Sequence, residues 1–334
     1  MSSVKKMLPG LLMCSLISLV GVFLGGHFPK VGGATFTILL GMVAGNTFAV
    51  SKDTYGSGSK FAEGPLLTYS IALLGGTLSF GNVAQIGLPG LSFIVIQMAM
   101  VICFCIYLGK KLGFSQDFSY LMASGNAVCG TSAIAATAPA IRASEQDKLI
   151  SITVVNLTGS ILMVVMPIVA AVVYKSDVLR TSALIGGVLQ SIGQVVASAS
   201  MVSEPVKELS MIFKIIRVIF IVGVVVALTS MKDASESEHS GRKVKFSFKQ
   251  IPWYVSAFFF MCILYSLGII PMALAKVFKS VCNAFEIVAL AGIGMRVDVR
   301  ELVRQGPKVT MFGLSIGCMQ VLMSLSLIYL IYGR

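Results

Sequence analysis

The most informative segment of the sequence is residues 125–142, Gly-Asn-Ala-Val-Cys-Gly-Thr-Ser-Ala-Ile-Ala-Ala-Thr-Ala-Pro-Ala-Ile-Arg, which lies between long apolar runs. It is built from small, hydroxyl and amide residues and contains two glycines and a proline. In hydrocarbon, irregular backbone is tolerated only where it is buried in protein or lines a wet cavity. The segment therefore predicts a broken helix whose ends face a solute, which points toward transport.

Composition places the whole chain in the membrane. Of the 334 residues, 56% are hydrophobic and 12% are charged, and the mean hydropathy is +0.90, whereas a soluble domain carries about 25% charged residues. We therefore expect an all-α polytopic membrane protein. The formal charge of +12 is spread over short loops, as positive-inside loops require, so no nucleic-acid partner is expected. Seven cysteines without a CxxC pair predict no metal site.

The apolar runs predict about eleven transmembrane helices, because a helix needs about 20 mostly apolar residues to cross the bilayer core. The first run lacks a small-residue cleavage site, so we interpret it as a retained span. The expected spans are 7–27, 34–50, 64–80, 88–109, 117–141, 149–174, 180–202, 208–230, 252–270, 272–295 and 307–332.

Lysine and arginine positions predict the orientation. With the N-terminus inside, most of the 26 basic residues fall on the cytoplasmic side, as the positive-inside rule demands. The expected localisation is a bacterial inner membrane, with a cytoplasmic N-terminus and a periplasmic C-terminus.

An odd number of spans predicts one extra N-terminal helix, in residues 1–30, plus two five-helix halves. The halves would be residues 31–174 and 175–334, the second carrying a cytoplasmic linker at 231–250. An odd repeat length makes the two halves inverted in the membrane, as in many secondary transporters. The fourth helices, 117–141 and 272–295, then correspond, and both carry polar residues out of place in a span.

The first candidate site is the polar start of the second half of the broken helix. Asn126, Cys129, Gly130, Thr131 and Ser132 would surround free backbone N–H groups at a positive dipole end, which is suited to bind an anion. The alternative is that these small residues only allow close helix packing.

Lys214 and Arg217 form a second candidate, because residues three apart share a helix face. We expect Arg217 to lie inside the hydrocarbon core, where a charge is expensive and needs a partner. The partner would be an anionic substrate or one of three carboxylates, Glu204, Glu208 and Glu286. An interfacial position for both bases is the alternative.

Two polar pairs inside apolar segments are candidates for ion coupling or gating. Glu286, with Asn283 beside it, is an intramembrane carboxylate and so a proton or cation site by default; the alternative is an interfacial position. Gln190 and Gln194 are four apart and share a face, and interhelical hydrogen bonding is their alternative role.

The sequence resembles the YeiH-type family of proposed sulfate exporters of bacterial inner membranes. The matching motifs cover nearly the whole chain: Gly125-x-Ala-Val-Cys129-Gly130-x-Ser132-Ala-Ile-Ala-Ala-x-Ala-Pro139, Gln194-Val-Val-Ala, Lys214-x-x-Arg217-Val, Pro252-Trp253 and Ala291-x-x-Gly294-x-x-x-Asp298.

That family is similar to the bile-acid-symporter and cation–proton-antiporter superfamily. The resemblance implies a core with two broken, crossing helices, 117–141 and 272–295, that moves against a static panel. The chain departs from the family where Gln190 and Ser191 replace a histidine and an acid, which argues against proton coupling there. Asn126 stands where a hydroxyl residue is usual, and Glu286 matches no family position.

The expected function is secondary active transport of a small anionic solute, sulfate-like or organosulfonate-like, by alternating access. A passive anion channel and a sodium- or proton-coupled organic-acid carrier are the alternatives. No Walker, zinc-binding or triad motif is present, so no enzyme is expected. Na⁺ or H⁺ as the coupling ion is the only expected cofactor, and the expected partners are the solute, the bilayer and a second copy of the chain.

Overall fold

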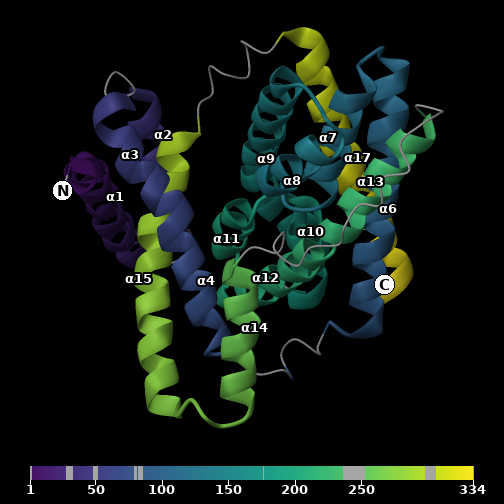
Figure 1. Cartoon of the computed structure of the whole chain (residues 1–334). Helices are drawn as coiled ribbons and strands as arrows, with labels where there is room; N and C mark the ends of the chain where they lie inside the picture. The colour runs from purple at the N-terminus through teal and green to yellow at the C-terminus, as the bar shows by residue number, and fades with distance from the viewer. Residues whose placement is uncertain are drawn as a thin grey trace. The chain divides into compact units, whose positions relative to one another are not determined.

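The structure is a computed structural model that describes residues 2–27, 33–47, 52–78, 81, 86–175, 177–235, 253–297 and 306–333. Every regular element among these residues is a helix (Figure 1). The linker predicted at 231–250 lies outside the described residues from 236 on, as do Pro252 and Asp298 of the family motifs.

The helices follow one another in the order of the predicted spans. They are α1 (Ser2–His27), α2 (Gly33–Thr47), α3 (Lys52–Phe61), the π-helical turn η2 (Ala62–Leu66), α4 (Leu67–Gly75), α6 (Gly87–Lys111), α7 (Gln116–Ala127), α8 (Thr131–Ala140), α9 (Glu145–Tyr174), α10 (Val178–Val188), α11 (Ile192–Ser200), α12 (Glu204–Ile219), α13 (Ile221–Ser235), α14 (Trp253–Ser266), α15 (Met272–Arg296) and α17 (Pro307–Tyr332).

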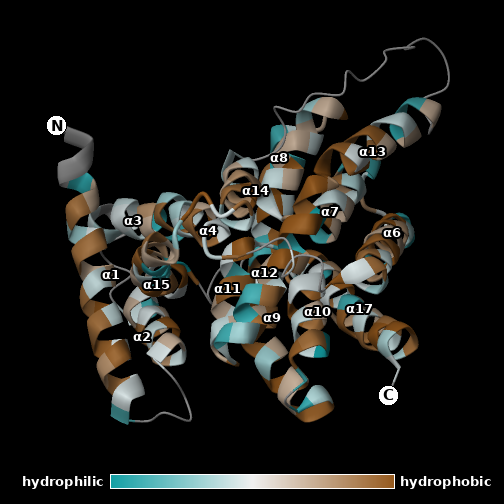
Figure 2. Ribbon diagram, turned by 90° about the horizontal axis from the view of Figure 1, so that it is seen from below, coloured by the Kyte–Doolittle hydropathy of each residue, from teal (hydrophilic) through white to brown (hydrophobic). Residues whose placement is uncertain are grey.

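Helix length and hydropathy confirm a polytopic membrane protein but not the count of eleven spans. Within the described residues, five helices are long and apolar enough to cross a membrane: α1, α6, α9, α15 and α17. The pair α12–α13, bent by 40°, makes a sixth, and α10 and α14 are shorter apolar helices. The coloured part of α1 is mostly hydrophobic, with a hydrophilic turn at its C-terminal end (Figure 2).

Three of the predicted spans are divided between two α-helices, one of them being 208–230, which the 40° bend between α12 and α13 divides. The expected break in 117–141 is confirmed, because α7 ends at Ala127 and α8 begins at Thr131. A second break, which the sequence analysis did not predict, divides 180–202 into α10 and α11 at residues 189–191. Each half is too short to cross a membrane alone. This is one reason why fewer helices of membrane-spanning length are found than the eleven spans predicted.

The prediction that 272–295 is the second broken helix is wrong, because α15 runs without interruption from Met272 to Arg296. Its glycines serve close packing instead. A Cβ added at Gly294 would lie 3.0 Å from Cα of Gly41 on α2, and one at Gly292 would lie 2.8 Å from Cβ of Ala62. Small residues at such positions let helix backbones approach one another in membranes.

The chain forms two compact units, each drawn from both predicted halves. Unit 1 comprises residues 1–85, 196–204 and 253–300, and unit 2 comprises residues 86–195, 205–252 and 301–334. The predicted halves, 31–174 and 175–334, are therefore not the compact units. The broken helix α7–α8 is the fourth span of the first predicted half, and α10–α11 is the first span of the second half. Pairing the spans of the two halves in chain order therefore does not match one broken helix with the other. The inverted repeat remains a prediction.

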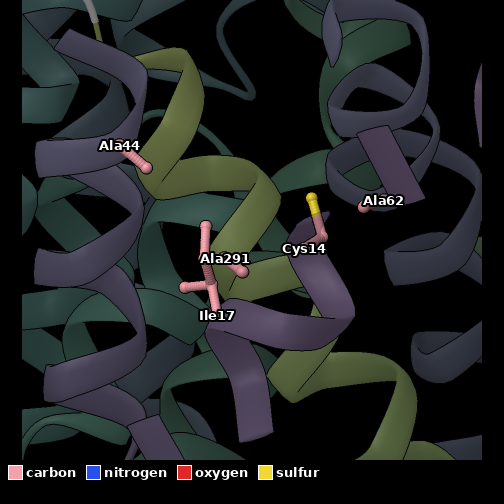
Figure 3. Packing of buried hydrophobic residues seen from close by; sticks show 5 residues of the cluster. All are labelled: Cys14, Ile17, Ala44, Ala62 and Ala291. Carbon is pink, nitrogen blue, oxygen red and sulfur yellow. The ribbon is translucent and has the colours of Figure 1, made fainter. Parts of the chain in front are cut away.

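Unit 1 is built around α15, which packs against α1, α2, α3, η2 and α4. Its core contains Cys14 and Ile17 of α1, Ala44 of α2, Ala62 of η2 and Ala291 of α15 (Figure 3). Three of these five residues are alanines, whose side chain is a single methyl group, so the helices can approach closely. The short loop 267–271 joins α14 to α15.

Unit 2 contains the first broken helix, α7 with α8, and also α10 with the first residues of α11; residues 196–200 of α11 belong to unit 1. α7 packs against α6, α8 and α9, and α10 packs against α9 and α17. α12 supplies the basic side chains Lys214 and Arg217, both buried. The whole of the first two candidate clusters therefore lies within one compact unit.

Candidate functional site

The two broken helices approach each other at their breaks. A Cβ added at Gly130, between α7 and α8, would lie 3.6 Å from Cβ of Gln190, between α10 and α11. Gly130 has a φ of +67° and a ψ of −121°, a conformation that side chains strongly disfavour. The positive φ is what favours glycine there, since an added Cβ would make only an ordinary van der Waals contact with Gln190. We call residues 126–132 and 186–191 the break region.

Arg217 binds the C-terminal ends of α7 and α10, the first halves of the two broken helices. Its guanidinium donates to the carbonyl oxygens of Asn126 and Ala127 at the end of α7 (2.8–3.1 Å). It also donates to those of Gly186, Gly187 and Leu189 at the end of α10 (2.5–3.2 Å). Only 1% of Arg217 is exposed. All three of its nitrogens are engaged, so the group is fully committed to backbone carbonyls.

Lys214, one helical turn earlier, joins the same two ends. Its Nζ donates to the carbonyl oxygens of Val128 (2.5 Å) and Leu189 (2.9 Å), and the residue is completely buried. The last carbonyls of a helix have no partner within the helix, and basic side chains near them are favourable. Each break therefore leaves backbone carbonyls without helical partners, and Lys214 and Arg217 of α12 donate hydrogen bonds to them.

Two of the three carboxylates predicted as partners of Arg217, Glu204 and Glu286, pair with other residues, and Arg217 donates to backbone carbonyls instead. Glu204 pairs with Lys279 (3.7 Å), and Glu286 accepts from the thiol of Cys282 (3.4 Å), all in unit 1. Backbone carbonyls can take the place of a carboxylate because several oriented peptide dipoles together solvate a buried cation. No sequence pattern indicates this arrangement, because a backbone acceptor can be any residue type.

Glycines at the end of α10 make room for this arrangement. A Cβ added at Gly186 would lie 2.6 Å from the carbonyl oxygen of Ser210 on α12. One added at Gly187 would lie 2.6 Å from the ring of Phe93 on α6. Since both contacts are far inside normal separations, α12 and α6 reach α10 only because residues 186 and 187 lack side chains.

A buried amide network connects the breaks to α6 and α17. Nε2 of Gln190 donates to Oδ1 of Asn126 (3.2 Å) and to Oε1 of Gln320 (3.0 Å). Nε2 of Gln320 donates to the carbonyl oxygen of Asn126 (3.0 Å), and Nε2 of Gln97 donates to the carbonyl oxygen of Gln320 (3.2 Å). The structure thus brings the predicted residues Asn126 and Gln190 together. It adds Gln97 and Gln320, which were overlooked although each is an amide inside an apolar run.

The start of α8 presents polar groups on the surface. Thr131 and Ser132 are exposed, whereas Cys129 is buried. Oγ1 of Thr131 donates to Oδ1 of the exposed Asn156 on α9 (3.1 Å). Gly130 provides no side-chain cap, and the first N–H groups of a helix lack intrahelical partners. We call Thr131, Ser132 and Asn156 the polar patch.

Gln194 has a structural role in starting α11. Oγ of Ser191 accepts from the N–H of Gln194 (3.1 Å), while Oε1 of Gln194 accepts from the N–H of Ser191 (3.0 Å). This is the reciprocal capping box expected of Ser-x-x-Gln. Gln194 also donates to the carbonyl oxygen of Asn156 (3.2 Å), and Gly159 on α9 leaves the space it fills.

The other predicted pair, Glu286 and Asn283, lies in unit 1 on α15. Glu286 is buried within the protein, with 3% exposed, and its position relative to the membrane stays a prediction. Asn283 lines an open cavity of about 460 Å³ together with Thr77, Tyr265, Met272, Ala275, Lys276, Lys279 and Ser280. The structure does not place this pair with the break region in one unit. No group of three potential metal ligands occurs among the described residues.

Comparisons with known proteins give a consistent family. Residues 9–313 match the family model described as conserved hypothetical protein 698. A UPF0324 membrane protein of Clostridium perfringens is 46% identical over 326 residues, covering 97% of this chain and 96% of that protein. One of Lactiplantibacillus plantarum is 41% identical over 332 residues, covering 98% of each. The UPF0324 inner membrane protein YeiH of Escherichia coli is 27% identical over 316 residues, covering 92% and 89%.

Proposed function

This chain belongs to the conserved hypothetical protein 698 family of multi-pass membrane proteins, which includes YeiH, and we propose that it is a secondary active transporter of a small anionic solute. The observation that carries the proposal is the meeting of two broken helices around two buried cations. Discontinuous helices with half-helix ends directed at charged ligands are the usual binding sites of secondary transporters.

The charge balance of the break region favours an anion. Each helix C-terminus is equivalent to about −0.5 elementary charge, so the ends of α7 and α10 together supply about −1. Lys214 and Arg217 supply +2 at neutral pH when both are protonated, and neither is paired with a carboxylate among the described residues. An excess of about +1 remains, and the N-terminal ends of α8 and α11 add to it. A solute of negative charge would complete this balance.

The residues divide into contact and positioning roles. We assign solute contact to the polar patch, whose three residues are exposed, and to the backbone N–H groups that follow Gly130. Lys214 and Arg217, which the sequence analysis assigned to solute contact, become positioning residues that fix the two half-helices. Asn126 and Gln190 would gate the site by joining or separating the two breaks, with Cys129 packed beneath.

The solute class follows from the donors. Hydroxyl, amide and backbone N–H groups arranged around a positive end suit a sulfate-like or organosulfonate-like oxyanion. Unit 2 would be the core that moves during alternating access, and unit 1, with Glu286 and Asn283, would be the panel. The proposed orientation keeps the N-terminus cytoplasmic and the C-terminus periplasmic.

A counterflow assay tests the proposal. Purified protein in liposomes loaded with unlabelled sulfate, sulfite, a sulfonate or a carboxylate is diluted into trace labelled anion. A carrier accumulates label transiently above equilibrium, and a channel only equilibrates it. Absence of counterflow for all of these anions would refute the proposal, and equilibration without overshoot would favour the channel alternative.

A thermal-shift screen selects the anion for that assay. A ligand at 100 times its dissociation constant stabilises the folded state by about 2.7 kcal/mol. The screen covers the same anions at equal ionic strength, so a general salt effect appears as a shift common to all of them. The substrate candidate is the anion that raises the unfolding temperature when the other anions do not.

A further inference from the structure

The break region holds its own cations where transporters of this kind hold a coupling ion. In transporters with discontinuous helices, unwound carbonyls and half-helix C-terminal ends coordinate the coupling Na⁺. Here the corresponding carbonyls are those of Asn126, Ala127, Val128, Gly186, Gly187 and Leu189. Each accepts a hydrogen bond from Lys214 or Arg217.

The engaged donors leave little room for a metal ion. Arg217 uses Nε, Nη1 and Nη2 on five carbonyls, and Lys214 uses Nζ on two. Both side chains are buried, at 1% and 0% exposed. A Na⁺ ion would have to displace one of them from its carbonyls, and it would then stand beside the remaining positive charge.

The groups around the two bases do not offset this repulsion. Within the described part of unit 2, the side chains joined to the break region by hydrogen bonds are the neutral Gln190, Gln320, Gln194 and Asn156. The buried carboxyl of Glu286 belongs to unit 1. The titratable group beside the two bases is the buried thiol of Cys129, and no carboxylate described at the breaks provides the negative charge that usually attracts a coupling cation.

We propose that this protein needs no metal cation at its breaks, because Lys214 and Arg217 permanently occupy the position of a coupling Na⁺. The inference deepens the proposed function, on which its transport consequence rests: anion exchange proceeds without Na⁺. It also predicts that removing Lys214 converts the site into one that an external cation can fill.

The test compares unfolding temperatures in sodium chloride and in choline chloride at equal concentration. For the wild type we expect the same temperature in both salts. For Lys214→Ser, which frees the carbonyl of Val128 and leaves that of Leu189 to Arg217 alone, we expect a lower temperature in choline that sodium partly restores. Lys207→Ser is the matched control, since Lys207 is another buried lysine of α12 and lies about 10 Å earlier along the helix.

The outcomes separate this inference from the proposed function. Sodium-specific stabilisation of the wild type would overturn the inference, and so would a Lys214→Ser variant that sodium stabilises no more than the control. In liposomes, sulfate counterflow should run equally in sodium and choline, whereas stimulation by sodium of about tenfold, worth 1.4 kcal/mol of coupling, would overturn it. If no anion is transported at all, the proposed function fails, while the unfolding comparison still decides whether the cation position is occupied.

Discussion

Arg217 donates two hydrogen bonds to the carbonyl oxygen of Ala127, from Nε at 3.1 Å and from Nη2 at 2.8 Å. Ala127 is the last residue of α7, so the bonds fall on the negative end of the half-helix. The same guanidinium reaches the end of α10. One side chain therefore fixes the ends of two broken helices, and the break region depends on it.

Arg217→Met should be the most destabilising substitution in the break region. It removes every donor that Arg217 supplies and leaves buried carbonyls unsatisfied, at a cost of about 1–3 kcal/mol for each group left without a partner. Arg217→Lys should recover little of this, because an ammonium cannot reproduce the guanidinium fork. Unfolding in detergent by titration with sodium dodecyl sulfate measures the loss.

Arg180→Gln is the control for that measurement. Arg180 is only partly buried and bonds to Asp177 and to the carbonyl oxygen of Tyr332, so a loss of about 1 kcal/mol or less is expected. Equal losses for the two arginines would show that Arg217 has no special role.

Gly130→Ala should destabilise the break by about 1–3 kcal/mol, because φ is positive there and a side chain strains the backbone. Gly223→Ala provides the matched control. Gly223 lies inside α13 with no atom close to an added Cβ, and alanine is the better helix former by about 1 kcal/mol. The two glycines should thus respond with opposite signs in the same unfolding assay, and a neutral Gly130→Ala would contradict the assigned turn.

Ser191→Ala and Gln194→Leu should each cost about 0.5–2 kcal/mol, the usual loss for a helix cap. Because the two residues cap each other, the double variant should cost less than the sum of the single losses. If the loss in the double variant equalled the sum of the two single losses, the two reciprocal hydrogen bonds at the start of α11 would not be coupled.

Asp117 and Lys232 should be coupled across unit 2. Nζ of Lys232 lies 2.6 Å from Oδ1 of Asp117 at the start of α7, and 2.6 Å from the carbonyl oxygen of Ile141 just after α8. A cycle with Asp117→Asn and Lys232→Met should give a coupling of about 0.5–3 kcal/mol. A coupling near zero would show that this contact does not tie α13 to the broken helix.

The sequence predicted the first break correctly because side chains mark it. Residues 125–132 combine glycine, amide and hydroxyl groups in a way that an uninterrupted span does not need. The second break carried similar signals that were overlooked: Gly186 and Gly187 end α10, and Ser191 with Gln194 forms a recognisable capping box. Their interpretation as a polar helix face hid the interruption.

The contacts of Lys214 and Arg217 could not be predicted in the same way. The spacing showed that both bases share a helix face, and their burial was expected for Arg217. Their acceptors are backbone carbonyls that become available only once both helices break, so the search for a carboxylate partner failed. Glu286 was correctly placed as a buried carboxyl, yet the thiol partner Cys282 and the continuous α15 depend on packing in unit 1.

The most direct test of solute binding at the start of α8 is counterflow through Ser132→Leu. Leucine at this exposed position would remove a hydroxyl donor and block the N–H groups after Gly130. Ser326→Leu on α17 is the control, since Ser326 is also exposed but bonds only to its own helix. We predict a rate at least about tenfold below wild type, or 1.4 kcal/mol, for Ser132→Leu and a wild-type rate for Ser326→Leu. Wild-type counterflow through a folded Ser132→Leu protein would contradict the account.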